Sequence, residues 1–242
     1  REPLLEELER MDRGGSIARV TEPTDWVSPL VIVRKKDGKL RVCMDLRKIN
    51  QCIKREHYQL LMREDIEAEL AGAKVFTHPD STAGFHQIPL DGETSNICTF
   101  AMPFGRYRFF RLPFGISSAP EVFQKALNEV FENLPGVKAY IDDVIIWGSS
   151  MKEHDERLKS ALQRAERAGL TFNATKCAVH VNEIEFLGDV ISHEGIRPNP
   201  NQVKCMTQMP EPKDKHAVQR MLDVANYFNK FLPSLAQKSV LL

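Results

Sequence analysis

The sequence predicts an α+β fold in which an antiparallel sheet carries helices on one face. Three observations lead to this fold class. Residues 118–134 have apolar side chains at helical spacing, two apolar strands at 137–141 and 144–147 flank a pair of aspartates, and a second helical pattern covers about 152–168. A short strand at 75–77 precedes them. The order strand, helix, strand, strand, helix is typical of an antiparallel sheet with helices packed against it.

Length and composition agree with a folded chain. The 242 residues are enough for one to two domains, and 42% apolar with 27% charged residues is far from the composition of disordered chains. The five cysteines are widely spaced and form no C-x-x-C pair, which argues against a disulfide framework and a zinc-thiolate site. The longest apolar runs are much shorter than the ~18 residues that a membrane span needs. We therefore expect an intracellular protein with no readable targeting signal and no membrane partner.

The first elements are predicted from periodicity and turn residues. Residues 2–12 place leucines and a methionine at helical spacing, and a pair of glycines then ends the helix. Two β-prone runs, 26–33 and 40–44, are joined by a segment containing Asp-Gly, which is a strong hairpin turn. We expect a helix followed by a β-hairpin.

This hairpin is strongly basic although the whole chain is neutral. Lysines and arginines number 33, equal to the aspartates and glutamates, but residues 34–55 hold nine basic and two acidic side chains. A second stretch, 106–111, alternates arginines with aromatic residues at the strand period of two. A solvated edge would explain the hairpin alone, whereas the two stretches together favour a phosphate-rich ligand.

The helices that follow have recognisable ends. Ser118 and Glu121 have capping-box spacing, Pro120 lies in the first turn, and Pro-Gly ends the pattern after residue 134. The helix at about 152–168 ends at a glycine and is expected to bury one row of apolar side chains, namely Leu158, Ala161, Leu162, Ala165 and Ala168. A last amphipathic helix covers residues 217–228 and is expected to have a cationic outer face formed by Lys215, Arg220 and Lys230.

Asp142 and Asp143 predict a cation site. Adjacent carboxylates at the tip of an apolar hairpin raise each other's pKa and resist burial unless a cation neutralises them. Mg²⁺ prefers such oxygen ligands and is often completed by substrate phosphates. Asp-Asp is also a common turn dipeptide, so the pair alone leaves both interpretations open. Asp80, at the end of the earlier strand, is the third carboxylate that a two-metal phosphoryl-transfer site would use.

Five ordered motifs resemble a known family. They are Asp80 with Phe85, Leu112-Pro113-Phe114-Gly115 running on to Gln124, Tyr140-Ile141-Asp142-Asp143, Gly169-Leu170-Thr171 with Lys176-Cys177, and Phe186-Leu187-Gly188. From about residue 4 to the last residue, the chain resembles the reverse transcriptase of a Ty3/gypsy-type LTR retrotransposon. The resemblance implies a right-hand polymerase fold with fingers, palm and a partial helical thumb. The expected divisions are 1–74 for fingers and the start of the palm, 75–195 for the palm, which includes a fingers segment at about 84–117, and 196–242 for a thumb-like region. We expect the chain to be truncated before any connection or RNase H domain.

The resemblance also implies a function and its residues. The expected activity is RNA-directed DNA polymerisation, in which deoxynucleoside triphosphates extend a primer on an RNA or DNA template. Asp80, Asp142 and Asp143 match the carboxylates that hold two Mg²⁺ ions, or Mn²⁺, and Lys176 matches a lysine that protonates the leaving pyrophosphate. Lys35, Lys36 and Arg41 match the residues that bind the triphosphate. Phe85 matches the aromatic gate against ribose, Phe114 and Gly115 line the nucleotide pocket, and Phe186, Leu187 and Gly188 match the primer grip.

The chain departs from the family pattern before its first aspartate. His78 and Pro79 stand where an apolar residue is usual, and a proline inside a central strand removes a ladder donor. The alternative to an active polymerase is therefore a decayed copy that folds and binds nucleic acid with little or no activity. A palm-type cyclase is disfavoured by the Leu-Pro-Phe-Gly and Phe-Leu-Gly motifs, because a cyclase has no primer to hold.

Overall fold

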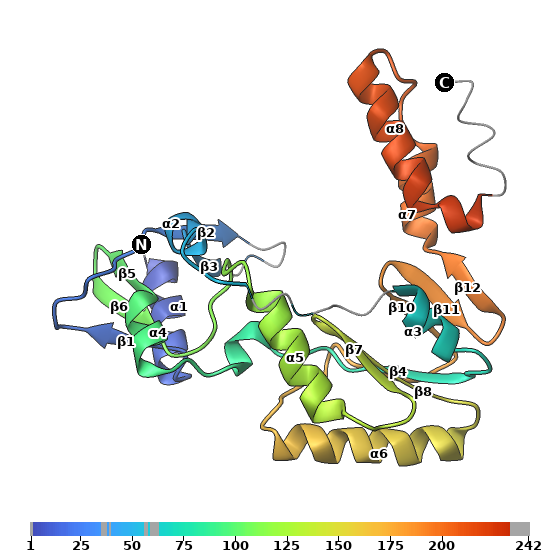
Figure 1. Cartoon of the computed structure of the whole chain (residues 1–242), viewed down its shortest axis with the longest axis horizontal. Helices are drawn as coiled ribbons and strands as arrows, with labels where there is room; N and C mark the ends of the chain where they lie inside the picture. The colour runs from blue at the N-terminus through green and yellow to red at the C-terminus, as the bar shows by residue number, and fades with distance from the viewer. Residues whose placement is uncertain (1, 35–37, 39, 56–57, 59–62, 233–242) are drawn as a thin grey trace.

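A computed structural model describes residues 2–34, 38, 40–55, 58 and 63–232 (Figure 1). Its helices are α1 Glu2–Arg13, α2 Arg47–Asn50, α3 Arg63–Glu69, α4 Gly92–Ile97, α5 Ala119–Phe131, α6 Met151–Arg167, α7 Pro200–Thr207 and α8 Lys215–Tyr227, with short 3₁₀ turns η1 Gly84–Gln87 and η2 Asn229–Phe231. Its strands are β1 Ile17–Val20, β2 Leu30–Arg34, β3 Leu40–Met44, β4 Val75–His78, β5 Thr99–Met102, β6 Gly105–Phe109, β7 Val137–Tyr140, β8 Asp143–Gly148, β9 Ala178–Val181, β10 Glu183–Phe186, β11 Asp189–Ser192 and β12 Gly195–Pro198.

The central sheet has the strand order β7-β8-β4-β9, and its neighbouring strands are antiparallel. Residues 144–147 of β8 are all apolar and buried because both faces of the strand are covered. Val144 and Ile146 pack against α5 and α6, whereas Ile145 and Trp147 pack on the opposite side, against residues of α3, β10 and β11. The predicted layer of helices on one face is thus present, and α3 covers the other face together with strands β10 and β11.

The N-terminal layer is built around a second sheet, of order β1-β6-β5. Helix α1 buries Leu8 and Met11 against this layer, as the sequence predicts. Strand β6 does not alternate in burial, because Gly105 to Arg108 are all half-buried and only Phe109 is fully buried. Tyr107 and Phe109 pack into the apolar core, whereas Arg108 donates to Asn96 Oδ1. The predicted hairpin is formed by β2 and β3, which pair in a regular antiparallel register. Lys35 and Lys36 lie outside the described residues.

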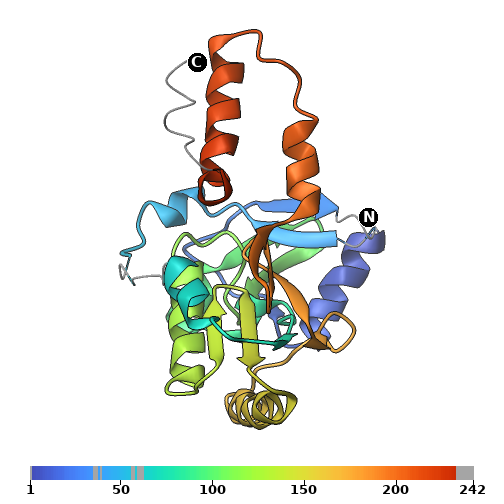
Figure 2. The ribbon, with the colours of Figure 1, turned by 90° about the vertical axis from the view of Figure 1, so that its right-hand side faces the viewer.

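The C-terminal part projects from the central body (Figures 1 and 2). A third sheet, β10-β11-β12, leads into α7, and α8 lies beside α7 at the end of the molecule. Asp214 caps α8 by accepting a hydrogen bond from the Ala217 N–H, at 2.7 Å. Within the described chain, no helix is long and apolar enough to span a membrane.

Three local expectations are wrong. Ser118 does not cap α5 with its side chain, since its backbone is already helical, with φ −91° and ψ 0°, instead of extended as at an N-cap, and Glu121 forms an ion pair with Arg55. Leu162 of α6 is 45% exposed instead of buried, and Ala168 is also exposed, because α6 contacts the sheet through the narrower row of Ala161 and Ala165, together with His154. The side chain of Lys230 is not part of a free cationic face, because it forms ion pairs with Glu67 and Asp189.

Candidate active site

The two adjacent aspartates lie at the turn between β7 and β8. Tyr140 pairs with Asp143, so that Ile141 and Asp142 form the two-residue turn. Ile141 has a positive φ of 53°, which is unfavourable for a β-branched residue. Backbone strain of this kind persists only where the surrounding structure fixes it.

Gln124 of α5 fixes this turn. Its side chain is fully buried. Gln124 Oε1 accepts a hydrogen bond from the Ile141 N–H, at 2.6 Å, and Gln124 Nε2 donates to the Ala139 carbonyl, at 2.9 Å. The second Nε2 hydrogen goes to Asn128 Oδ1 at 2.7 Å. One helix residue thus bonds the backbone on both sides of Tyr140 and orients the turn that carries the aspartates.

Asp80, two residues after the end of β4, lies beside the turn that carries Asp142 and Asp143. It forms an isolated bridge with Asp143 that continues the register in which Thr77 faces Ile146. Pro79 lies in a gap of this ladder, because the regular pairs with β8 end at Thr77 and pairing resumes only at Asp80, and the β4–β9 pairs end at His78. An interruption at this position is typical of a proline, which has no N–H to donate.

The three aspartates line one cavity of about 550 Å³. Arg41 and Lys176 also line it, so that acidic and basic groups face one space. Its other lining residues are Glu7, Arg10, Met11, Leu40, Val42, His78, Ser81, Thr82, Ala83, Gly84, His86, Phe114 and Asn173. Such a cavity suits a ligand that carries both phosphates and a bound cation.

The Asp142 carboxyl has a raised pKa. Partial loss of hydration is the largest cause, and the negative charge of Asp143 adds to it. The Arg41 guanidinium opposes the rise, and the Asp80 charge contributes to it. Asp142 is thus close enough to both carboxylates for mutual repulsion, and a divalent cation would relieve that repulsion.

Neighbouring residues hold the carboxylates and leave room for them. His78 Nε2 lies 3.2 Å from Asp143 Oδ1. The Asp80 carbonyl accepts a hydrogen bond from the Asn173 N–H, at 2.8 Å, and the Asn173 carbonyl accepts one from the Lys176 N–H, at 2.9 Å, so the loop that carries Lys176 is tied to Asp80. Gly84 has no substitute here, since a Cβ atom would lie 2.9 Å from Asp142 Oδ1 and 3.1 Å from the Phe123 ring.

The proposed nucleotide-pocket residues are only partly at the cavity. Phe114 lines it, and the Arg41 guanidinium stacks 5.1 Å from the Phe114 ring centroid. Phe85 is not among the lining residues and packs between Phe114 and Phe123, with centroid distances of 5.4 and 5.6 Å. Gly115, also outside the lining, has a φ of 106° that favours glycine.

Asn50 fastens this loop. Its amide donates to the Gly115 carbonyl and accepts from the Ser117 N–H, both at 2.9 Å. The loop that contains Phe114 is thereby tied to α2, the short helix that follows the basic hairpin. Neither Asn50 nor Gln124 was predicted as a site residue. A glutamine next to Phe123 on an otherwise apolar helix face could have indicated a buried polar contact.

The predicted primer-grip residues lie in the turn between β10 and β11. Phe186 is only 3% exposed and belongs to the core, but its ring also meets the His78 ring edge-on at 6.4 Å. Leu187 has a φ of 51° and, with Gly188, forms the turn. None of the three lines the carboxylate cavity. They border the site only through His78.

The donor set fits a divalent cation with oxygen ligands. Asp80, Asp142 and Asp143 provide hard carboxylate oxygens in one cavity, and the charges of Asp143 and Asp80 add to the rise that partial loss of hydration causes in the pKa of Asp142. Among the described residues, these three are not a group whose ligand atoms all lie within 4.8 Å of one another. A site completed by substrate phosphates does not need such a closed cluster.

Comparisons with known proteins agree with this geometry. Residues 33–191 match the family described as "Reverse transcriptase (RNA-dependent DNA polymerase)". The chain is 31% identical over 237 residues to the "Retrovirus-related Pol polyprotein from transposon 297" of Drosophila melanogaster, covering 95% of this chain and 22% of that protein. It is also 31% identical over 211 residues to the "Transposon Tf2-3 polyprotein" of Schizosaccharomyces pombe, covering 86% of this chain and 16% of that one.

The solved structures show the same fold. The foamy viral protease-reverse transcriptase in complex with double-stranded DNA superposes with a TM-score of 0.89 at 22% identity, covering 98% of this chain and 42% of that one. The predicted α+β right-hand polymerase fold is therefore confirmed. Because the family match covers most of the chain and the relatives are retrotransposon polyproteins, the chain belongs to the reverse transcriptase (RNA-dependent DNA polymerase) family, in the form found in Ty3/gypsy-type retrotransposon Pol polyproteins.

Proposed function

We propose that this chain extends a primer 3′-hydroxyl with deoxynucleotides on an RNA or DNA template. The observation that carries the proposal is one cavity lined by Asp80, Asp142 and Asp143 together with Arg41 and Lys176. The chain spans 16 to 22% of the length of the two polyproteins described above, so activities such as RNase H would belong to other parts of a longer protein. Its location in a cytoplasmic particle or the nucleus is part of the same proposal.

Asp80 and Asp142 would hold two Mg²⁺ ions, or Mn²⁺, with Asp143 assisting. When bound, the ions activate the primer hydroxyl and neutralise the charge that develops on the triphosphate. His78, at 3.2 Å, orients Asp143, and Gln124 orients the Ile141–Asp142 turn through the backbone. The chain's own contribution is the fixed position of the carboxylates.

The basic and aromatic residues would bind the nucleotide. Arg41, with Lys35 and Lys36 of the hairpin, would neutralise the triphosphate, since an arginine fork matches phosphate oxygens. Lys176 would donate a proton to the leaving pyrophosphate. Phe114 and Gly115 would border the base pair being formed, Phe85 would support selection against ribose, and Phe186, Leu187 and Gly188 would hold the primer end. Residues 1–74 and about 84–117 would form the fingers, 75–195 the palm, and 196–242 the start of the thumb.

Primer extension on a homopolymer RNA template with Mg²⁺ tests the proposal. Asp142→Asn removes a charge at the turn and should lower the extension rate by more than about 100-fold, since even outer partners of a metal are worth about 10–100-fold. Asp65→Asn, an exposed residue of α3, is the matched control and should keep the parent rate. Equal rates for Asp142→Asn and the parent would refute the site. A parent that binds primer–template without extending it would favour the decayed-copy alternative.

A further inference from the structure

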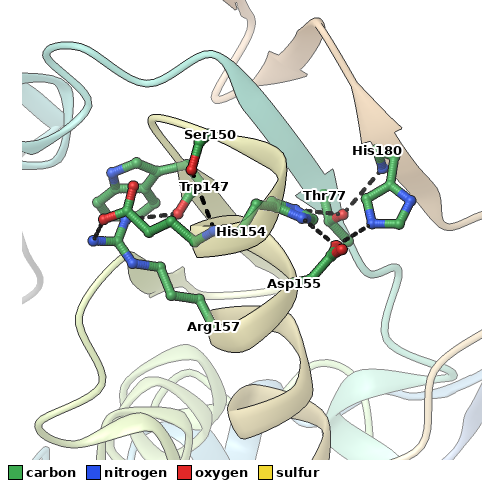
Figure 3. Close-up of polar contacts among 8 residues, drawn as sticks. Thr77, Trp147, Ser150, His154, Asp155, Arg157 and His180 are labelled. Atoms are coloured by element: carbon green, nitrogen blue, oxygen red, sulfur yellow. Dashed lines mark hydrogen bonds and ion pairs between the residues drawn. The ribbon is translucent and has the colours of Figure 1, made fainter.

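A second cluster of metal-binding side chains lies apart from the carboxylate cavity. His154 and Asp155 of α6 and His180 of β9 each offer one ligand atom, and these atoms all lie within 4.8 Å of one another. None of the three residues lines the carboxylate cavity. Figure 3 shows both imidazoles turned toward the Asp155 carboxylate. The motifs of the polymerase family do not account for this cluster.

The fold brings the three side chains together from two elements. Helix α6 packs its first turns against the central sheet, so that His154 is fully buried beneath it, while Asp155 is 52% and His180 42% exposed. His180 has a φ of 55° on the outermost strand of that sheet. A non-glycine residue in this conformation is uncommon, and here it accompanies an imidazole that faces α6.

The hydrogen bonds hold the ligand atoms in place. His180 Nε2 lies 2.6 Å from Asp155 Oδ1, and His154 Nδ1 lies 3.4 Å from the same oxygen. The other nitrogen of His154, Nε2, lies 3.0 Å from Thr77 Oγ1, which also accepts from the His180 N–H at 3.3 Å. Thr77 therefore orients His154 from behind, as an outer partner does in many metal sites.

The chemistry of the three side chains also suits a metal ion. Each hydrogen bond to Asp155 Oδ1 needs a proton on the imidazole nitrogen that faces it. Metal binding requires imidazole nitrogens with a free lone pair and an ionised carboxylate, so an ion would take the place of these protons.

The ligand types decide which ion fits. Two imidazole nitrogens and one carboxylate oxygen suit Zn²⁺ and similar transition ions, whereas Mg²⁺ prefers oxygen ligands and keeps its waters. With metal–ligand bonds of about 2.0–2.1 Å, neighbouring ligand atoms in a tetrahedral site lie about 3.3 Å apart. The 3.4 Å separation of His154 Nδ1 and Asp155 Oδ1 matches this value, and the 2.6 Å contact of His180 must widen by less than 1 Å.

We propose that His154, Asp155 and His180 bind a divalent transition ion of the Zn²⁺ class, with water in the fourth position. The ion would join α6 to β9, whose pairing with β4 is broken by the register shift between Phe76 and His78. Because Thr77 belongs to β4 and lies three residues before Asp80, the ion would stiffen the strand that leads to the carboxylate cavity. It would be structural and separate from the ions of the proposed polymerase reaction.

Zn²⁺ binding to the purified 242-residue chain tests the proposal. After chelator treatment and buffer exchange, Zn²⁺ is titrated against a chromophoric chelator, and Co²⁺ is added separately to record its visible spectrum. We expect one Zn²⁺ per chain, no competition from millimolar Mg²⁺, and the intense Co²⁺ absorption of a four-coordinate site. The melting temperature should rise by about 5–10 °C at a hundredfold excess over the Kd.

Matched variants distinguish this site from any other. His180→Gln and Asp155→Asn change exposed residues, so the chain should still fold, and each should weaken Zn²⁺ binding at least tenfold and remove the melting shift. His193→Gln changes an exposed histidine in the turn after β11 and should bind Zn²⁺ as the parent does. A parent that binds no Zn²⁺, or a His180→Gln variant that binds it as tightly as the parent, would show that the cluster is only a hydrogen-bonded link between α6 and β9.

Discussion

The Asp142 carboxylate lies where its own charge is unfavourable. Partial loss of hydration and the charges of Asp143 and Asp80 raise its pKa, although Arg41 opposes them. The folded chain therefore binds a proton at Asp142 more tightly than the unfolded chain does. The same arrangement that is useful for binding a cation lowers the free energy of unfolding when no cation is present.

Asp142→Asn should accordingly stabilise the metal-free chain near pH 7. The carboxyl pKa is higher in the folded than in the unfolded state, so the stability of the parent relative to the variant is greatest below the ordinary value of 3.8 and is lost as pH rises through the folded pKa. Because Asp142 keeps access to solvent, we expect a small rise in melting temperature, about 1–2 °C at pH 7. Thermal melts of both chains between pH 3 and 8 in a chelating buffer measure it.

Adding Mg²⁺ should make the melting temperature of the parent higher than that of Asp142→Asn. A cation that binds only the folded parent raises its melting temperature in proportion to the logarithm of its concentration. Asp142→Asn should respond much less. If Asp142→Asn were less stable than the parent in chelator at pH 7, the repulsion inferred from the raised pKa would be wrong.

Two roles are open for Phe85, namely selection against ribose and packing in the core. The Phe85 ring packs between Phe114 and Phe123 and does not line the cavity. Phe85 can therefore select against ribose in two ways: it holds Phe114 in place, or it contacts a bound nucleotide directly. Phe85→Val should raise ribonucleotide relative to deoxynucleotide incorporation by about tenfold, the equivalent of about 1.4 kcal/mol of lost steric exclusion. The ratio of kcat/KM values for the two substrates measures this. A lowered melting temperature with an unchanged ratio would assign Phe85 to the core alone.

At the scale of elements, α5 and the β7–β8 hairpin form one unit through Gln124. Its amide bonds the Ile141 N–H and the Ala139 carbonyl, so the strained turn is fixed by a helix side chain. A buried donor or acceptor that loses its partner costs about 1–3 kcal/mol. The position of Asp142 therefore depends on a residue that binds neither nucleotide nor metal in our proposal.

Gln124→Met keeps the length of the side chain and removes its three hydrogen bonds, to Ile141, Ala139 and Asn128. We expect a lower melting temperature, a reduced extension rate, and a higher Mg²⁺ concentration for half-maximal extension, because the turn no longer holds Asp142 in place. Gln163→Met, an exposed glutamine on α6, is the matched control. Loss of stability with an unchanged Mg²⁺ requirement would mean that Gln124 supports the core but does not position the turn.

Local sequence patterns predict the strands and helices around Asp142 but miss contacts between distant segments. The order of strands and helices around Asp142 follows from periodicity, because β8 is buried on both faces and α5 on one. The capping box at Ser118 is wrong because the Ser118 backbone is already helical, with φ −91° and ψ 0°, while Glu121 pairs with Arg55, 66 residues earlier in the chain, a contact that no local pattern contains. Pro79 marks the point where strand pairing is interrupted, but the local sequence could not show that pairing with β8 resumes at Asp80 in the same register.

At the scale of the whole molecule, a cluster of ion pairs joins segments that are distant in the sequence. Asp189, at the start of β11 and 1% exposed, forms ion pairs with Arg63 of α3 and Lys230 of η2. Glu67 of α3 joins both cations, at 2.8 Å from Arg63 and 2.6 Å from Lys230. The Tyr227 ring lies 6.0 Å from the Arg63 guanidinium. The C-terminal helices are thus fastened to the central body by buried charges, which a composition of zero net charge does not reveal.

Asp189→Asn should loosen this junction without touching the carboxylate cavity. Removing one partner of a buried pair typically costs about 3–5 kcal/mol, and the low end applies because both cations are partly exposed. We expect a lower melting temperature and shorter products per binding event, since the helices that would contact the duplex lose their attachment, while the rate of the first nucleotide addition stays near that of the parent. A second change, Lys230→Met, removes one uncompensated cation and should restore part of the stability in the double variant. Single-turnover addition, product length in the presence of a trap and thermal melts measure the three quantities, and parent-like product lengths and melting in Asp189→Asn would show that the junction does not hold the C-terminal helices.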